Sequence, residues 1–365
     1  MARIDAFLEL GRQQGCSDIH LAVGMPPMVR LHGTLEPIKY RELSGEEMME
    51  LVNEILSKDQ QKKFENGQDL DIAYESGEAG GRFRANLFHK ISGIGAVFRV
   101  IPPRTPTLKD LGLPMVVEKM LDAHQGLILV TGATGTGKST TLAAMIDWLN
   151  RNRKFNIITL EDPIEYMHDS DASLVVQRSV GIHVESFANG LREALREDPD
   201  VILVGELRDP DTISMAMTAA ETGHLVLGTL HTSSAVKTLD RIIDAMPAEQ
   251  KAQAATFLAQ HLNGVISQVL VRTPDGRGRK AVLEILVNTP GIANLIMDRK
   301  IFQIPSSLQT GRELGMQLMD QALLEAIKNK EVDPDDAYVN ATDKKLFQRF
   351  VTNPELLPQV SLAVS

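Results

Sequence analysis

The sequence predicts an α/β protein with an N-terminal α/β domain, a core domain built on a parallel sheet, and a small C-terminal helical region. A glycine-rich loop at residues 132–139 stands between an apolar run and a helical pattern. From residue 108 to residue 289, short apolar runs alternate with helical patterns, which is typical of a parallel sheet covered on both faces. The chain has 365 residues, which exceeds the usual size of a domain with a single hydrophobic core. Several domains are therefore expected.

The composition is that of an ordinary globular protein, with 43% hydrophobic and 24% charged residues. The single cysteine, Cys16, excludes a disulfide framework and favours the reducing cytoplasm, and we interpret it as a small buried hydrophobic residue. The N-terminus lacks the pattern of a signal peptide, and no apolar run approaches the roughly 18 residues that a membrane helix needs. The net charge of −10 disfavours binding of nucleic acid. We therefore expect a cytoplasmic protein that neither enters a membrane nor binds nucleic acid.

Residues 1–101 are predicted to form the N-terminal domain. Apolar residues alternate from Ile19 to Val23 as in a half-buried strand, and Ser44 and Glu47 have the spacing of a capping box. The proline-rich stretch at residues 102–107 suits a stiff, extended linker. The predicted elements are a helix at 5–13, strands at 17–23 and 28–31, a hairpin turn at His32-Gly33, a helix from Ser44, and strands at 82–89 and 95–101.

Residues 108–289 are predicted to form the core domain, and residues 290–365 the C-terminal helical region. In the latter, Asp333 is expected to cap a helix whose first residue is Pro334. The predicted core elements are strands at 126–130, 156–160, 201–204, 225–230 and 281–287, and helices at 140–150, 186–196 and 211–221. Further helices are expected at 291–297, 314–328 and 334–338.

The loop at residues 132–139 reads Gly-Ala-Thr-Gly-Thr-Gly-Lys-Ser and has the strand–loop–helix context of a phosphate-binding loop. Its glycines let backbone N–H groups point inward, and the helix N-terminus adds a partial positive charge. Lys138 is expected to reach the β- and γ-phosphates, and the Ser139 hydroxyl to bind Mg²⁺. The sequence therefore predicts a nucleoside triphosphate site. Its residues are Gly132, Ala133, Thr134, Gly135, Thr136, Gly137, Lys138, Ser139 and Thr140.

Two apolar runs end in carboxylates that are candidates for the chemistry of phosphoryl transfer. Glu206 follows the run at 201–204, in the Walker-B position, and Gly205 replaces the usual aspartate. We expect Glu206 to activate water and to help hold Mg²⁺ through water, although a surface carboxylate at a strand end is the alternative. Glu161 follows an earlier strand and is expected in the same site. Asp162 and Glu165 fit a site or solvated turn positions equally well.

Two histidines bracket the strand at residues 225–230. A histidine at a strand end near a γ-phosphate can sense it through a hydrogen bond that hydrolysis removes. We apply this interpretation to His224 and His231, with a structural role as the alternative. Zinc is not expected, because no third ligand stands at metal-like spacing.

Three arginines lie on the last strands of the N-terminal domain: Arg82, Arg84 and Arg99. The spacing of Arg82 and Arg84 puts both on one face of a strand. Two interpretations stay open for them. The face is solvated, or it supplies positive charge to the transition state in the site of a neighbouring subunit.

On these residues the chain resembles the PilT/PilU pilus-retraction ATPases, within the larger group of type II/IV secretion ATPases. The resemblance extends over nearly the whole length and depends on several motifs together, because the phosphate-binding loop alone would not be specific. The motifs are residues 17–21, 82–86, 132–139, 161–166, 196–209, 221–224 and 229–232.

The resemblance implies a PAS-like N-terminal domain and a RecA-like core that hydrolyses ATP with Mg²⁺. It further implies a ring of six subunits that docks from the cytoplasmic side on an inner-membrane platform protein of the pilus machine. Glu206 would be the catalytic carboxylate, with Glu161 assisting and His231 coupling the site to the interface. Arg82, Arg84 and Arg99 would approach the phosphates or a neighbour's site.

One segment departs from the retraction ATPases. Those similar to PilT carry Ala-Ile-Arg-Asn-Leu-Ile-Arg-Glu, whereas residues 291–298 here read Gly-Ile-Ala-Asn-Leu-Ile-Met-Asp, without either arginine. Residues 273–280 and 313–316 look more like the accessory PilU branch. A retraction motor and an accessory subunit that works with a second retraction ATPase therefore both stay open. A pilus-extension or type II secretion ATPase is less expected. The long N-terminal region and four-cysteine site of the extension-type relatives are not found here.

Overall fold

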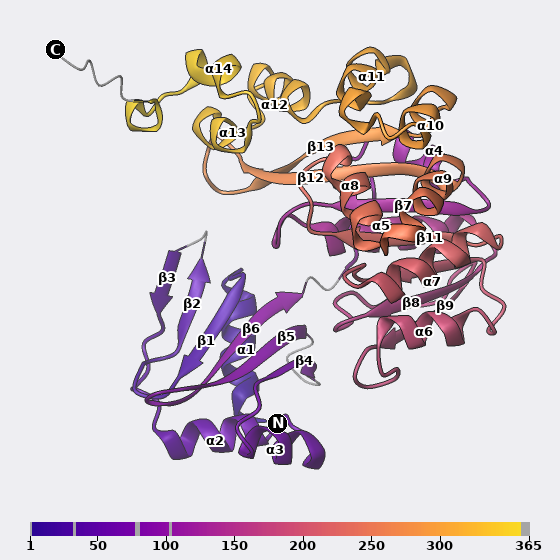
Figure 1. Ribbon diagram of the computed structural model, residues 1–365. Coiled ribbons are helices and arrows are strands. Elements are labelled where there is room, and N and C mark those ends of the chain that lie inside the picture. The colour runs from indigo at the N-terminus through magenta and orange to yellow at the C-terminus, as the bar shows by residue number, and fades with distance from the viewer. Residues whose placement is uncertain (1, 32–33, 77–80, 102–103, 359–365) are drawn as a thin grey trace. The chain divides into compact units, whose positions relative to one another are not determined.

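The computed structural model describes residues 2–31, 34–76, 81–101 and 104–358 and divides into two compact units (Figure 1). The N-terminal unit comprises Met1–Thr105 and Pro163–Met167, and the core unit comprises Pro106–Asp162 and His168–Ser365. The first break falls after Thr105, inside the stretch expected as a linker, of which residues 102 and 103 lie outside the described part. The hairpin turn expected at His32-Gly33 also lies outside it.

In the N-terminal unit, the described strands form an antiparallel sheet in the order β3-β2-β1-β6-β5-β4. Alternate strand residues such as Ile19, Leu21 and Phe83 pack with helix residues such as Leu8 and Leu51 in one core. The strands are β1 (Asp18–Ala22), β2 (Met28–Leu31), β3 (Thr34–Pro37), β4 (Leu70–Ser76), β5 (Gly81–Lys90) and β6 (Gly93–Ile101). The helices are α1 (Arg3–Gln13), α2 (Gly45–Asn53) and α3 (Lys58–Glu65).

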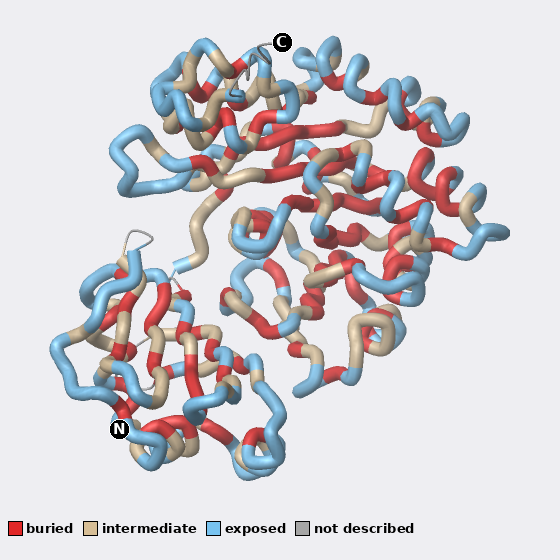
Figure 2. The backbone as a smooth tube through the Cα atoms, turned by 60° about the vertical axis from the view of Figure 1, so that its left-hand side comes forward, coloured by how far each residue is buried: buried red, intermediate tan, exposed pale blue. Residues whose placement is uncertain are grey.

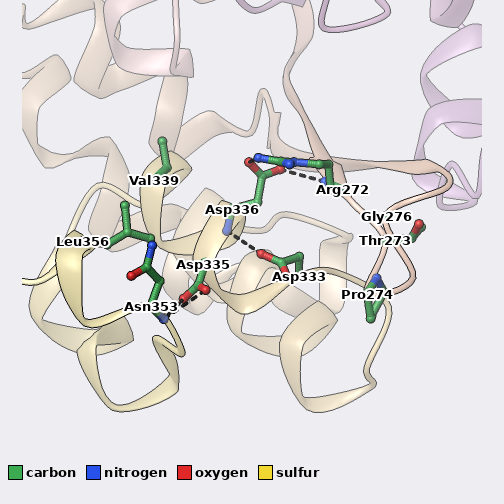
Figure 3. A pocket seen from close by; sticks show the side chains of 10 residues that line it. All are labelled: Arg272, Thr273, Pro274, Gly276, Asp333, Asp335, Asp336, Val339, Asn353 and Leu356. Atoms are coloured by element: carbon green, nitrogen blue, oxygen red, sulfur yellow. Dashed lines mark hydrogen bonds and ion pairs between the residues drawn. The ribbon is translucent and has the colours of Figure 1, made fainter. Parts of the chain in front are cut away.

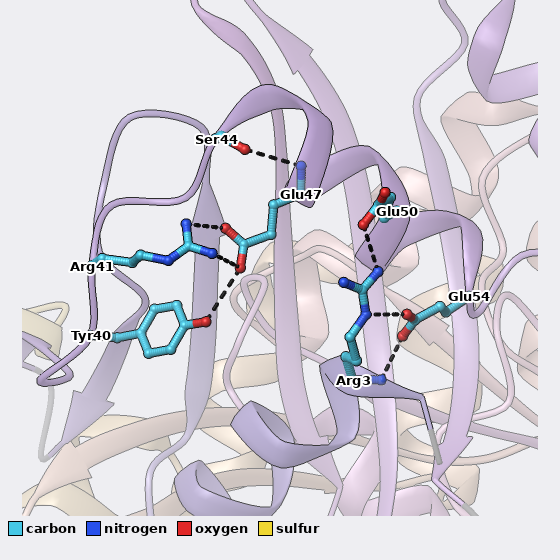
Figure 4. A network of polar contacts seen from close by, with 7 residues as sticks. All are labelled: Arg3, Tyr40, Arg41, Ser44, Glu47, Glu50 and Glu54. Carbon is cyan, nitrogen blue, oxygen red and sulfur yellow. Dashed lines mark hydrogen bonds and ion pairs between the residues drawn. The ribbon is translucent and has the colours of Figure 1, made fainter.

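Half of the capping box expected at α2 forms. The Ser44 hydroxyl accepts a hydrogen bond from the Glu47 backbone N–H at 3.2 Å, but the Glu47 carboxylate binds the Arg41 guanidinium at 2.7 Å (Figure 4). The complete box lies at α3, where Ser57 and Gln60 bond each other reciprocally. Arg41 therefore binds the carboxylate that the spacing of Ser44 and Glu47 predicted for the cap.

A second set of ion pairs ties α1 to α2 (Figure 4). The Arg3 guanidinium donates to Glu54 Oε1 at 2.7 Å and to Glu50 Oε2 at 2.8 Å. These groups are solvent-exposed, and such pairs contribute little to stability. Their effect is to orient the first turn of α1.

In the core unit, the described strands form one sheet in the order β13-β12-β7-β11-β10-β8-β9. All neighbours are parallel except β13, which runs antiparallel to β12. The expectation of a parallel sheet is thus wrong for the run at 281–287, because only six residues separate β12 from β13 and a parallel crossover needs about a dozen. The strands are β7 (Gly126–Thr131), β8 (Asn156–Glu161), β9 (Leu174–Ser179), β10 (Val201–Val204), β11 (Leu225–Leu230), β12 (Leu262–Arg272) and β13 (Arg279–Val287).

Helices cover both faces of this sheet, as expected. Along β7, Leu127 and Leu129 face one hydrophobic cluster, while Ile128 and Val130 face the other. All strands of this sheet except the edge strand β9 are accordingly buried along most of their length (Figure 2). The second cluster contains α4 (Val116–Leu121) and α5 (Lys138–Asn152), and the first contains α6 (Phe187–Ala194), α7 (Pro210–Glu221), α8 (Ala235–Ala245) and α9 (Lys251–His261).

The helices after β13 pack in two groups. Ile292, Ile304 and Met316 join the first core cluster, whereas Leu323 and Phe347 form a separate cluster with residues of β12 and β13. The elements are α10 (Pro290–Met297), α11 (Ile304–Thr310), α12 (Met319–Lys328), α13 (Pro334–Asn340) and α14 (Lys344–Phe347). Short 3₁₀ turns occupy Ala248–Gln250, Ile301–Gln303, Arg312–Leu314, Gln348–Phe350 and Pro354–Leu356.

Two helix starts in this region test the sequence patterns. Asp333 caps α13 by accepting from the Asp336 N–H at 2.8 Å, and Pro334 is the first helical residue, as predicted. The helix expected from residue 314 instead begins at Met319. Gly315 has a φ of +84°, and Gln317 pairs with Ile285 as an isolated bridge, so the chain is extended there. Among the described helices, none combines the length and the apolar character required to cross a membrane.

Candidate active site

The glycine-rich loop joins the buried strand β7 to the 15-residue helix α5. Gly132, Gly135 and Gly137 have φ values of +145°, +80° and +88°, in the region that side chains disfavour. A Cβ atom on Gly132 would stand only 2.4 Å from the backbone oxygen of Gln268, so close packing also requires glycine there. The sequence pattern thus produces the wrapped backbone that a phosphate-binding loop needs.

Lys138 begins α5 and turns back over the loop. Its side-chain ammonium donates to the backbone oxygens of Gly132 at 2.9 Å and Ala133 at 3.0 Å, and the residue is only 9% exposed. Ser139, the second residue of α5, is exposed at the helix N-terminus. A cation, a hydroxyl and a helix N-terminus around a glycine loop fit a magnesium-bound triphosphate.

Four neighbouring strands end at the same edge of the sheet and carry the other predicted groups. The strands lie in the order β7, β11, β10 and β8. The glycine-rich loop follows β7, His231 follows β11, and Glu206 lies just after β10. Glu161 is the last residue of β8. All four strands are parallel, so their carboxyl ends coincide. Ligands of open α/β sheets bind outside this edge. The structure therefore brings together the loop, the histidine and both carboxylates predicted for the site.

Glu206 is joined to the loop through His231. The Nε2 atom of His231 lies 3.1 Å from Glu206 Oε1, and its Nδ1 atom lies 3.4 Å from the Thr134 hydroxyl. Arg208 Nε donates to the same Glu206 oxygen at 2.5 Å. A neutral histidine that donates from Nε2 would accept from Thr134 at Nδ1, which makes the contacts mutually consistent. The carboxylate is thus oriented by an imidazole that also contacts the phosphate-binding loop.

Glu161, at the end of β8, is held by two polar side chains. Its Oε1 atom accepts from the Thr159 hydroxyl at 2.7 Å and from the Gln177 amide at 3.2 Å. Glu165 belongs to the N-terminal unit, where it accepts from Arg84 at 2.9 Å. Of the two additional carboxylates left open in this segment, Glu165 is therefore an ion-pair partner in the N-terminal unit.

His224 does not share the site edge. It precedes β11, at the amino end of the strand, and its Nδ1 atom lies 2.9 Å from the backbone oxygen of Ala219 in α7. The sensing role predicted for His224 is therefore wrong. The residue instead contacts the C-terminal end of α7. Two histidines that bracket a strand necessarily lie at opposite edges of the sheet, so only one can face the loop.

The three arginines are engaged within the N-terminal unit. Arg84 pairs with Asp71 at 2.6 Å as well as with Glu165, and Arg99 pairs with Asp18 at 3.1 Å. An Arg82 NH2 group donates to the backbone oxygen of Ile164 at 3.2 Å. Arg82 and Arg84 lie on one face of β5, opposite the buried Phe83, as predicted. Their action in a neighbouring site remains a prediction, and Arg84 would have to leave two carboxylates to perform it.

Two residues near the loop had no role assigned from the sequence. Arg208, inside a recognised motif, contacts Glu206. Gln268 on β12 donates from Nε2 to the backbone oxygen of Thr136 at 2.5 Å and accepts from the Thr141 hydroxyl at 2.8 Å. The signal available for Gln268 was a pair of polar residues, Ser267-Gln268, interrupting the apolar run of an unrecognised strand.

A cavity of about 380 Å³ elsewhere in the core unit lies beside the C-terminal end of β12 (Figure 3). Its carboxylates are engaged locally: Asp336 accepts from the Arg272 N–H at 2.7 Å, and Asp335 accepts from the Thr352 N–H at 2.6 Å. None of the predicted site residues lines it. The lining residues are Arg272, Thr273, Pro274, Gly276, Asp333, Asp335, Asp336, Val339, Asn353 and Leu356.

A parallel sheet that feeds a glycine loop into a helix, with a histidine and carboxylates at adjoining strand ends, defines a P-loop ATPase. The chain belongs to the family described as "Type II/IV secretion system protein", whose model matches residues 3–332.

Known members of this family resemble the chain over most of its length. It is 48% identical over 321 residues to the type IV pilus retraction ATPase PilT of Pseudomonas aeruginosa, covering 88% of this chain and 92% of that protein. It is 39% identical over 337 residues to the type IV pilus ATPase PilU of the same organism, covering 92% of this chain and 88% of that protein. A crystal structure of the pilus retraction motor PilT with bound ADP superimposes with a TM-score of 0.87 at 41% identity, covering 96% of this chain and all of that one.

These comparisons confirm the resemblance inferred from the motifs and the predicted architecture of a PAS-like N-terminal domain with a RecA-like ATPase core. The protein is an ATPase.

Proposed function

We propose that this chain is the motor subunit that couples ATP hydrolysis to retraction of a type IV pilus, and so to twitching motility. The observation that carries the proposal is the connected set of contacts from the loop at Thr134 through His231 to Glu206. This arrangement gives a nucleotide-bound loop a direct mechanical link to a water-activating carboxylate. The high similarity to PilT over most of both chains supports pilus retraction as the work that hydrolysis drives.

Hydrolysis would use groups at the shared strand edge. The N–H groups of residues 132–140 and the Lys138 ammonium would bind the β- and γ-phosphates, and Glu206 would take a proton from the attacking water. The Ser139 hydroxyl would hold Mg²⁺, with Glu206 contributing through water, and the ion would neutralise the charge that develops on the phosphates. Glu161 would assist Glu206 by holding the Thr159 hydroxyl and the Gln177 amide at the end of β8, the strand next to β10.

His231 would transmit the state of the nucleotide. Its contact with Thr134 depends on the position of the loop, and its other nitrogen contacts the catalytic carboxylate. When the γ-phosphate leaves, the loop side of this bridge changes its partners, and the residues that follow His231 move with it. Such motion, passed between subunits, is the proposed power stroke.

The working assembly would be a ring of six chains at the cytoplasmic face of the inner membrane, docked on the platform protein of the pilus machine. Arg82, Arg84 and Arg99 would supply transition-state charge, from the same chain or a neighbour. For Arg84 this requires exchange of Asp71 and Glu165 for phosphate, a swap between anionic partners that its guanidinium permits.

Replacement of Glu206 by Gln tests the chemistry. ATP binding should persist, while turnover should fall by about 10²- to 10⁴-fold, because the amide cannot accept the water proton. The measurements are fluorescence titration with labelled nucleotide and phosphate release from ATP. Glu249→Gln, an exposed carboxylate in a 3₁₀ turn, is the matched control and should retain wild-type turnover. Undiminished phosphate release by Glu206→Gln would remove Glu206 from the proposed role.

An accessory subunit is the second candidate, favoured by one observation. Residues 291–298, which comprise α10 after Pro290 together with its C-cap, lack the two arginines of the retraction ATPases. A subunit of this kind would use nucleotide mainly as a conformational ligand for a second retraction ATPase. Negligible turnover by the purified chain, with intact binding of magnesium nucleotide, would favour this candidate over the motor.

A further inference from the structure

Gln268 lies beside the phosphate-binding loop on a strand that pairs directly with β7. In the parallel ladder Ser267 is opposite Thr131, the last residue before the loop, so Gln268 stands next to Gly132. The residue is 3% exposed. Its backbone oxygen occupies the space that a side chain at position 132 would need. The backbone of Gln268 therefore packs directly against the first residue of the loop.

The side chain of Gln268 reaches the end of the same loop. Its Nε2 atom donates to the backbone oxygen of Thr136 at 2.5 Å, and its Oε1 atom accepts from the Thr141 hydroxyl at 2.8 Å. The orientation of the amide follows from chemistry, because a carbonyl oxygen can only accept. A Cβ atom on Gly137 would stand 2.9 Å from Nε2, so the amide packs closely on the last loop glycine as well.

The contacts of Gln268 thus bracket the loop at its start, its end and the first turn of α5. A neighbouring hydrogen bond of 2.8 Å between the Thr131 and Ser267 hydroxyls, both buried, holds the same two strands in register. A loop with three glycines at positive φ loses much conformational freedom when it wraps a phosphate. Contacts that restrict the free loop to the bound shape reduce this loss and so strengthen binding.

We propose that Gln268 is a positioning residue for nucleotide binding, which fixes residues 132–137 in their phosphate-binding shape through Thr136 and Thr141 without touching the nucleotide. The inference depends on the proposed role of the loop in binding ATP. Replacing Gln268 should therefore weaken the affinity for ATP and ADP while leaving the chemical step at Glu206 nearly intact.

The test compares Gln268→Met with Gln317→Met. Methionine keeps the length of the side chain and removes both polar atoms. Gln317 is a matched control, since its Nε2 also donates to a backbone oxygen, that of Leu283, at 2.8 Å, in the same unit but outside the loop. We expect the dissociation constant for fluorescent ADP to rise about tenfold for Gln268→Met and less than about twofold for Gln317→Met. The KM for ATP should rise with it, and kcat at saturating ATP should stay within about threefold of wild type.

Thr141→Val provides a second measurement that does not alter the buried glutamine. It removes the hydroxyl that orients the amide and should weaken ADP binding about threefold alone, but have almost no effect in the Gln268→Met background. Equal affinity of wild type and a folded Gln268→Met overturns the inference, as does a Thr141→Val effect that is undiminished in the double variant. A wild-type chain that binds no nucleotide would instead overturn the proposed function.

Discussion

Glu284 shows at the scale of one residue how a buried carboxyl group joins separate elements. The residue is 6% exposed on β13, and its two carboxylate oxygens accept from the Ala235 N–H at 2.8 Å and the Met319 N–H at 3.3 Å. These groups are the first residues of α8 and α12. Burial raises the pKa of Glu284 above its ordinary value, with a further rise from Asp320, against the lowering effect of the two backbone hydrogen bonds.

This raised pKa predicts a pH-dependent stability. A carboxyl group with a folded pKa above its unfolded value of 4.5 contributes fully below that value, and the contribution is lost as pH rises through the folded pKa. Gln does not titrate, so the melting temperature of wild type minus that of Glu284→Gln should be larger near pH 5 than near pH 8. Thermal unfolding across this range measures the difference. A gap that is constant or grows with pH would show that the folded pKa is not raised.

Caps set the start of the elements that carry the site. Asp209 precedes α7 and follows Glu206 and Arg208 by only a few residues, so the cap also ends the loop that carries Glu206. Its two oxygens accept from the Thr212 N–H at 2.8 Å and the Thr212 hydroxyl at 2.7 Å. Pro210 at the first helical position needs no partner for an N–H group.

Removal of this cap should destabilise the core unit. Asp209→Ala leaves the Thr212 N–H without its side-chain partner and should lower the free energy of unfolding by about 0.5–2 kcal/mol. Asp209→Asn keeps an accepting oxygen and should recover most of the loss. Chemical denaturation of the three proteins gives the comparison. Equal destabilisation by Ala and Asn would indicate that the charge, and not the hydrogen bond, matters at this position.

At the scale of the whole molecule, the chain visits the N-terminal unit twice. After the first 105 residues it returns at Pro163–Met167, directly beyond the carboxylates Glu161 and Asp162. Arg84 pairs with Glu165 in this returning segment. A displacement at the end of β8 would therefore pass along one continuous stretch of chain into Pro163–Met167.

Deletion of the gene in its own organism tests whether the proposed motor drives pilus retraction or extension. If the chain drives retraction, deletion of its gene should leave cells with excess pili and without twitching motility. Lys138→Ala, which removes the ammonium group that contacts the glycine-rich loop, should reproduce this phenotype, and the wild-type gene should restore motility. Pilus counts by electron microscopy and motility on agar provide the measurements. Cells without pili would reverse the assigned direction.

The local chemistry of the sequence was sufficient to predict the phosphate-binding loop, the family, the strands that carry Glu161 and Glu206, and the cap at Asp333. These features depend on residues close together in the chain, where glycine φ angles, apolar periodicity and capping hydrogen bonds act directly. Only the tertiary structure decided that β12 lies beside β7 with Gln268 against the loop, that Arg84 and Arg99 hold carboxylates, and that His231 faces the loop while His224 does not. Those outcomes depend on pairing between segments far apart in the chain, because strand order and sheet edge are set by packing of the whole core, which no local pattern records.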